Sequence, residues 1–127
     1  MTQIRLIAVA AALAAAGSAQ ALTPAEIDAL RGTTLKEIRI AGASALRLSV
    51  AAYMKEVCTD PVTNTSNLHV YFYSTSAQST DHRAYACNLG VAVGNYAKGT
   101  PVLVYKRDAG GSGQGVNPIA TAALQAH

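Results

Sequence analysis

The sequence contains no tryptophan, one phenylalanine and only two cysteines among its 127 residues. Half of the residues are hydrophobic, but many of these are alanines, so the core must be built from small aliphatic side chains and tyrosines. Charged residues make up 13% of the chain and leave a formal net charge of +3. This surplus is too small to predict binding to a nucleic acid, and it suits a small anion better than a polyanion.

The few cysteines and histidines limit the chemistry further. His69, His82 and His127 are scattered, and the cysteines do not form a C-x-x-C motif, so the spacing of a metal site is missing. We therefore expect no metal and no other cofactor. A lone pair of cysteines in an exported protein most simply forms one intramolecular bond, which predicts a disulfide between Cys58 and Cys87.

Only the N-terminal region has a long apolar run. Residues 6–16 are uninterrupted apolar residues that follow Arg5, and Ala19 and Ala21 occupy the small positions of a signal peptidase site. The run is too short to span about 30 Å of hydrocarbon. We predict a signal peptide over residues 1–21, a periplasmic or secreted product without stable membrane insertion after cleavage, and a charge reduced from +3 to +2 by the loss of Arg5.

The mature chain begins with a short helix and a first strand–turn–helix unit. Thr23 to Glu26 forms a capping box with Pro24 at the first helical position, and Gly32 is placed to end the helix. Residues 35–40 alternate between apolar and charged types, which predicts a strand. A turn of small residues follows, and apolar residues then recur at helical intervals over residues 45–57, with Ser44 as the expected N-cap.

A second unit of the same kind lies near the end of the chain. Residues 102–105 are continuously apolar, as expected of a strand covered on both faces. A glycine-rich loop follows, and Asn117 and Pro118 have the residue types of an N-cap and a first helical position. Residues 68–73 alternate like a strand, whereas residues 83–94 fit either a short helix or a further strand. Strands that alternate with helices predict an α/β fold with a mostly parallel sheet and flanking helices.

The two glycine and serine turns are the candidate site. In an open α/β sheet they would lie on one edge, where backbone N–H groups and helix N-termini can bind an anion. The glycine loop does not fit a Walker loop, a dinucleotide fingerprint or a hydrolase elbow. Arg47, Lys106 and Arg107 are candidate anion contacts, whereas Asp108 would repel an anion and is better explained as a turn former. The alternative is that the loop is only a connector.

Together the segments over residues 38–45 and 110–116 resemble two motifs of the periplasmic phosphate-binding proteins of ABC transporters, in the type II periplasmic binding protein superfamily. The resemblance implies that residues 22–127 form part of a lobe of such a protein. It implies a phosphate-like oxyanion as ligand and an inner-membrane ABC permease as partner. The ligand-binding residues carried over by motif position are Ala43, Ser44, Ala45, Ser112, Gly113 and Gly115.

The resemblance covers a minority of the chain, and members of that family are more than twice as long. The chain is therefore either an amino-terminal fragment or a divergent relative. We expect a solute-binding protein and not an enzyme. An exported structural or surface-interaction module on the same fold remains the alternative, and a hydrolase that uses Ser112 is disfavoured because no ordered set of serine, histidine and acid accompanies it.

Overall fold

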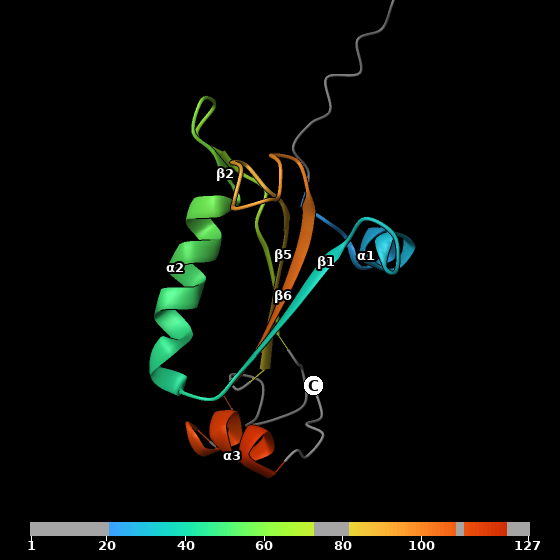
Figure 1. Ribbon diagram of the computed structural model, residues 1–127. Helices are drawn as coiled ribbons and strands as arrows, with labels where there is room; N and C mark the ends of the chain where they lie inside the picture. Colours follow the sequence, from blue (N-terminus) through green and yellow to red (C-terminus); the bar gives the residue numbers. More distant parts are fainter. Residues whose placement is uncertain (1–20, 73–81, 109–110, 122–127) are drawn as a thin grey trace, which may run out of the picture.

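The computed structural model describes residues 21–72, 82–108 and 111–121 (Figure 1). Their elements follow one another in this order: α1 (Pro24–Leu30), β1 (Lys36–Ala41), the 3-10 helix η1 (Ser44–Leu46), α2 (Arg47–Val57), β2 (Thr59–Asp60), β3 (Thr65–Ser66), β4 (His69–Phe72), β5 (His82–Asn88), β6 (Pro101–Arg107) and α3 (Gly113–Thr121). No helix of the described residues is long and apolar enough to cross a membrane.

The main sheet has four strands in the order β1-β6-β5-β4, and only β1 and β6 run parallel. The pairs β6-β5 and β5-β4 are antiparallel, so the predicted α/β fold with a mostly parallel sheet is wrong. The error comes from β5, which lies in the stretch that the sequence pattern left undecided. This strand is buried on both faces at its centre and shows no alternation. Because it pairs with both neighbours in the reverse direction, the sheet is mixed.

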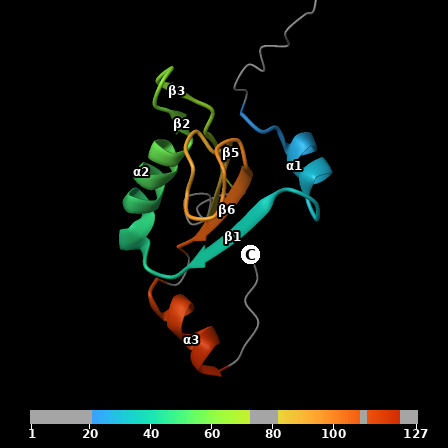
Figure 2. The ribbon, with the colours of Figure 1, turned by 45° about the horizontal axis from the view of Figure 1, so that its top comes forward.

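Helices lie on both faces of this sheet, with α2 on one side and α1 on the other (Figures 1 and 2). The cluster on the α2 face is built from these buried residues: Met54, Val57, Cys58, Tyr85, Cys87, Leu89, Val102 and Val104. The cluster on the α1 face is smaller and contains Leu22, Ile27, Leu35, Ala86 and Leu103. Small aliphatic side chains and Tyr85 thus fill the core, which suits the composition of the chain.

The first helix agrees with its sequence signals. Glu26 N–H donates to the Thr23 hydroxyl at 3.3 Å, and Thr23 N–H donates to the Glu26 carboxylate at 2.7 Å, so the predicted capping box is confirmed. The hydrogen bonds from the Thr23 backbone and hydroxyl lower the pKa of Glu26. Gly32 follows the helix with a φ of +75°, a conformation that glycine adopts without strain.

The other two helices begin at residues different from those predicted. Ser44 is the first residue of η1 and not an N-cap, because α2 begins at Arg47 with Leu46 as its cap and no side-chain capping bond. α3 begins at Gly113, so Asn117 and Pro118 lie within the helix. In both cases the sequence contains suitable capping residues, but Gly42 and Gly115 pack closely against each other near the start of both helices, and this contact constrains the chain there.

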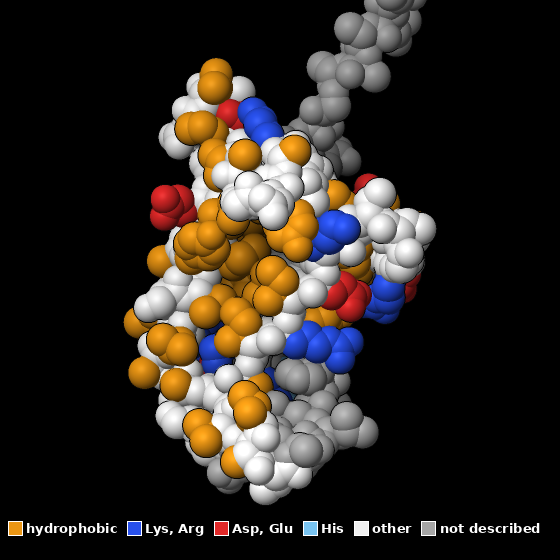
Figure 3. Space-filling model, viewed as in Figure 1, with side chains coloured by type: hydrophobic (Ala, Val, Ile, Leu, Met, Phe, Trp, Pro, Cys, Tyr) orange, Lys and Arg blue, Asp and Glu red, His pale blue; other side chains and the backbone are white. Residues whose placement is uncertain are grey.

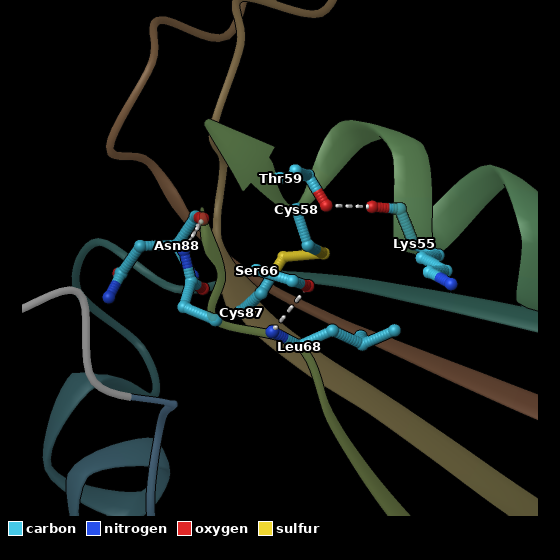
Figure 4. The surroundings of a disulfide bond; sticks show 8 residues. Lys55, Cys58, Thr59, Ser66, Leu68, Cys87 and Asn88 are labelled. Atoms are coloured by element: carbon cyan, nitrogen blue, oxygen red, sulfur yellow. Dashed lines mark hydrogen bonds between the residues drawn. A yellow bond between two sulfur atoms is a disulfide. The ribbon is translucent and has the colours of Figure 1, made fainter. Parts of the chain in front are cut away.

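The predicted disulfide is confirmed: Cys58, just after α2, is bonded to Cys87 of β5, with their Cα atoms 5.8 Å apart (Figure 4). Both residues are fully buried. Next to the bond, the side chain of Asn67 donates to Asn88 C=O at 2.9 Å and accepts from Asn88 N–H at 2.8 Å. The disulfide is consistent with an oxidising compartment.

Candidate functional site

The parallel pairing of β1 and β6 sets the position of both turns. Ala41 lies opposite Arg107, and Gly42 N–H donates to Arg107 C=O at 3.2 Å. Each strand therefore ends at the same edge of the sheet, and each leads from there into a helix, η1 in one case and α3 in the other. The structure thus brings together the two turns that the sequence placed at one edge, although the rest of the sheet is antiparallel.

The two turns touch each other through their backbones. A Cβ atom on Gly42 would lie 3.1 Å from the Cα of Gly115, and one on Gly115 would lie 3.0 Å from the carbonyl oxygen of Ala41. Gly42 also has a φ of +103°, which side chains rarely adopt. Glycine is favoured at both positions because the first turn of α3 rests directly on the end of β1.

The first turn presents three successive backbone donors. Leu46 N–H donates to Ala43 C=O at 3.1 Å and Arg47 N–H donates to Ser44 C=O, so the chain turns tightly into η1. Within the described residues, the N–H groups of Ala43, Ser44 and Ala45 have no acceptor. Ser44 and Ala45 are exposed. Unused N–H groups at the start of a helix are the donors that an oxyanion needs.

In the second turn, several backbone N–H groups already donate to carbonyl oxygens nearby. Gly111 N–H donates to Asp108 C=O, and both Gly115 and Val116 donate to Ser112 C=O at 3.0 and 3.3 Å. The N–H of Gly115 is therefore engaged within the turn, and this glycine serves the close approach to Gly42. Ser112 and Gly113 are exposed at the beginning of α3. Of the residues carried over for this turn, these two are exposed, whereas Gly115 is half-buried.

A buried lysine lies beneath the first turn. Lys106 is 1% exposed, and its ammonium group donates to Gly42 C=O at 2.9 Å and to Arg107 C=O at 3.2 Å. It also donates to the Asp108 carboxylate, whose second oxygen accepts from Arg47 Nε at 2.7 Å. Burial raises the pKa of Asp108, but the hydrogen bonds from Lys106 and Arg47 outweigh that effect and hold the pKa below its usual value.

Three charged groups make up this cluster. Two cations, Lys106 and Arg47, bind the Asp108 carboxylate next to the Gly42 turn. Asp108 is a structural anion with two partners and does not act as a lone repulsive charge. This role was not predicted from the sequence. The available signal was Lys106 itself. It follows Val102 and Val104 at alternate positions of β6, so its side chain lies on the same buried face, and a buried cation needs a partner.

No known protein family, curated protein or solved structure matches this chain. The resemblance to periplasmic phosphate-binding proteins therefore rests on the two motifs alone. The described residues contain no group of three or more histidine, cysteine or acidic side chains that could hold a metal ion.

Proposed function

We propose that the chain is an exported periplasmic solute-binding protein, or part of one, which binds a small oxyanion such as phosphate at the paired turns. The observation that carries this proposal is the packing of Gly42 against Gly115 at one sheet edge. It places the N–H groups of Ala43, Ser44 and Ala45 on the same edge as the start of α3, where Ser112 adds a hydroxyl. An inner-membrane ABC permease is the partner that such a protein would serve.

A guanidinium group close to the donors favours an anion over a neutral solute. The Arg47 side chain is 29% exposed, so it is accessible from the solvent. Ser44, Ala45, Ser112 and Gly113 are all exposed. Because salt screens exposed charges, we expect binding at this edge to weaken as ionic strength rises. The donors bind and orient an oxyanion without any step of bond cleavage.

Thermal unfolding with and without inorganic phosphate tests the proposal. A ligand that binds only the folded state stabilises it by about 2.7 kcal/mol at a hundredfold excess over Kd. We expect phosphate to raise the Tm of the parent protein. Ser44→Ala and Ser112→Ala should each reduce that rise, because each removes one exposed hydroxyl donor.

Thr63→Ala is the matched control, since this exposed hydroxyl residue lies between β2 and β3, at the opposite end of the molecule from α3 (Figure 1). It should leave the phosphate-induced shift unchanged. If the parent protein and both serine variants show equal shifts, or none, the turns are connectors. The exported structural or surface-interaction module is then the better description.

The export proposal has its own test at the N-terminus. Leu22 is 5% exposed and packs with Ile27 and Leu103, and its carbonyl oxygen accepts a hydrogen bond from the Tyr71 hydroxyl at 2.6 Å. Cleavage after Ala21 would leave this anchoring residue as the first of the mature chain. We expect intact-mass analysis of the exported protein to give a chain that begins at Leu22. A mass that includes residues 1–21 would contradict the export proposal.

A further inference from the structure

β1 is an edge strand of the main sheet, and no described strand pairs with its outer side. Among the described strands it pairs only with β6. Figure 1 looks onto this edge, with β1 in front of β6 and no helix covering it. Figure 3 shows hydrophobic side chains gathered between α2 and β1 on this side, with acidic and basic side chains beside them. Ile38, at the centre of β1, is 45% exposed.

The hydrogen bond from Gly42 N–H to Arg107 C=O determines which backbone groups of β1 face outward. In a strand, the N–H and C=O groups of successive residues point alternately to the two sides. The N–H and C=O groups of residues 36, 38, 40 and 42 therefore point toward β6. The N–H and C=O groups of Glu37 and Arg39 point away from the sheet and can bind another strand.

We propose that a second copy of this chain pairs with this edge, β1 against β1 in antiparallel orientation, about a two-fold axis at Ile38. In this register Glu37 lies opposite Arg39 of the other copy, and the reverse pair is formed as well. Both residues have outward backbone groups, so the two pairs exchange four main-chain hydrogen bonds. The interface is isologous, as closed dimers require.

Neighbouring registers are excluded by charge. A shift that centres the pairing on Glu37 brings two carboxylates together, and one that centres it on Arg39 brings two guanidinium groups together. If the two-fold axis lay between two residues, backbone groups that point toward β6 would be placed opposite groups that point outward. Side chains from opposite faces of the sheet would then be paired. Charged side chains usually protect an edge strand from pairing, but the order Glu37, Ile38, Arg39 is complementary to itself.

The same register also covers exposed apolar surface. Ile38 meets Ile38 of the other copy as a non-hydrogen-bonded pair, in which side chains approach most closely. On the opposite face, the Glu37 carboxylate already accepts from Arg31 Nε at 2.7 Å. Its other oxygen lies 3.8 Å from the Arg39 guanidinium of its own chain. A guanidinium from the second copy completes a network around this carboxylate. The two four-stranded sheets then form one continuous sheet.

Sedimentation analysis of the protein with its disulfide intact tests the proposal, and we expect a reversible dimer. Arg39→Glu and Glu37→Arg each place like charges opposite one another twice, so each should weaken self-association about tenfold or more. An equimolar mixture of the two variants should form a heterodimer, because every facing pair is then of opposite charge. Lys55→Glu on the exposed side of α2 changes the net charge by the same amount as Arg39→Glu and should leave self-association unchanged.

Amide hydrogen exchange provides a second readout that does not depend on the variants. The amides of Glu37 and Arg39 should exchange more slowly as protein concentration rises. A monomer at every concentration, with fast exchange at both positions, would overturn the proposal. So would protection that is independent of concentration, since another part of the same chain would then cover the edge. Two single variants that fail to associate when mixed would rule out this register.

Discussion

Replacement of Asp108 by asparagine should lower the free energy of unfolding by about 3 to 5 kcal/mol, the cost of breaking a buried ion pair from one side. The carboxylate is almost completely buried and binds both Lys106 and Arg47. Without it, the Lys106 ammonium retains only the carbonyl oxygens of Gly42 and Arg107 as strong acceptors. Urea denaturation of the parent protein and the variant measures the difference.

The same carboxylate predicts a dependence on pH. Its pKa in the folded protein is lower than its usual value, so its contribution to stability is complete above that usual value and is lost as the pH falls through the lowered folded pKa. The parent protein should therefore lose stability in this acid range. The asparagine variant should lose less over the same range, because it has no carboxylate to protonate at this position.

Two further variants separate the buried pair from a general effect of losing an aspartate. Asp60→Asn breaks a more exposed ion pair, in which Lys98 lies 2.7 Å from the carboxylate, and it should cost much less than Asp108→Asn. The double variant Lys106→Met/Asp108→Asn removes both buried charges and should be more stable than Asp108→Asn alone. Strictly additive losses in the double variant would mean that the two charges are not coupled.

Several local signals in the sequence predicted local structure correctly, although the capping signals for α2 and α3 did not. The capping box of α1 involves residues three apart, so the short segment that contains Thr23 and Glu26 determines it. The alternation over residues 35–40 predicted β1. The pairing of Cys58 with Cys87 followed from their being the only two cysteines. Each of these predictions needed no knowledge of how distant segments pack.

The sheet direction could not be predicted because it depends on β5. This strand has the sequence His-Arg-Ala-Tyr-Ala-Cys-Asn, whose centre is buried on both faces, so it lacks the alternation of a half-buried strand. Its strand character comes from pairing with β4 and β6. β5 lies between β4 and β6 and runs antiparallel to both, so these neighbouring strands are not parallel as expected.

The candidate site was predictable only in part. The glycines and serines marked both turns, and the parallel pair β1-β6 places them together. The charge cluster was not predicted, because Arg47 and Asp108 are 61 residues apart and meet only when α2 packs beside β6. Patterns within one segment reveal backbone requirements such as that of Gly42, but not the partner of a buried charge.

Loss of the disulfide is the second change with a large expected effect. The bond between Cys58 and Cys87 spans 29 residues, and the chain-entropy model gives about 3 to 4 kcal/mol for a loop of that size. Domains of this size are typically stable by only about 5 to 15 kcal/mol. We therefore expect reduction of the bond, or the double variant Cys58→Ala/Cys87→Ala, to shift the urea midpoint strongly downward.

The double variant is also the control for the reductant. Reductant should lower the stability of the parent protein and leave that of Cys58→Ala/Cys87→Ala unchanged, since the variant has no bond to break. The sheet should persist in the folded fraction of both forms, because Asn67 still bridges to Asn88 and the apolar cluster beneath α2 remains. If thiol titration shows complete reduction while the urea midpoint of the parent protein stays in place, the bond does not contribute to stability, and the chain-entropy argument fails for this loop.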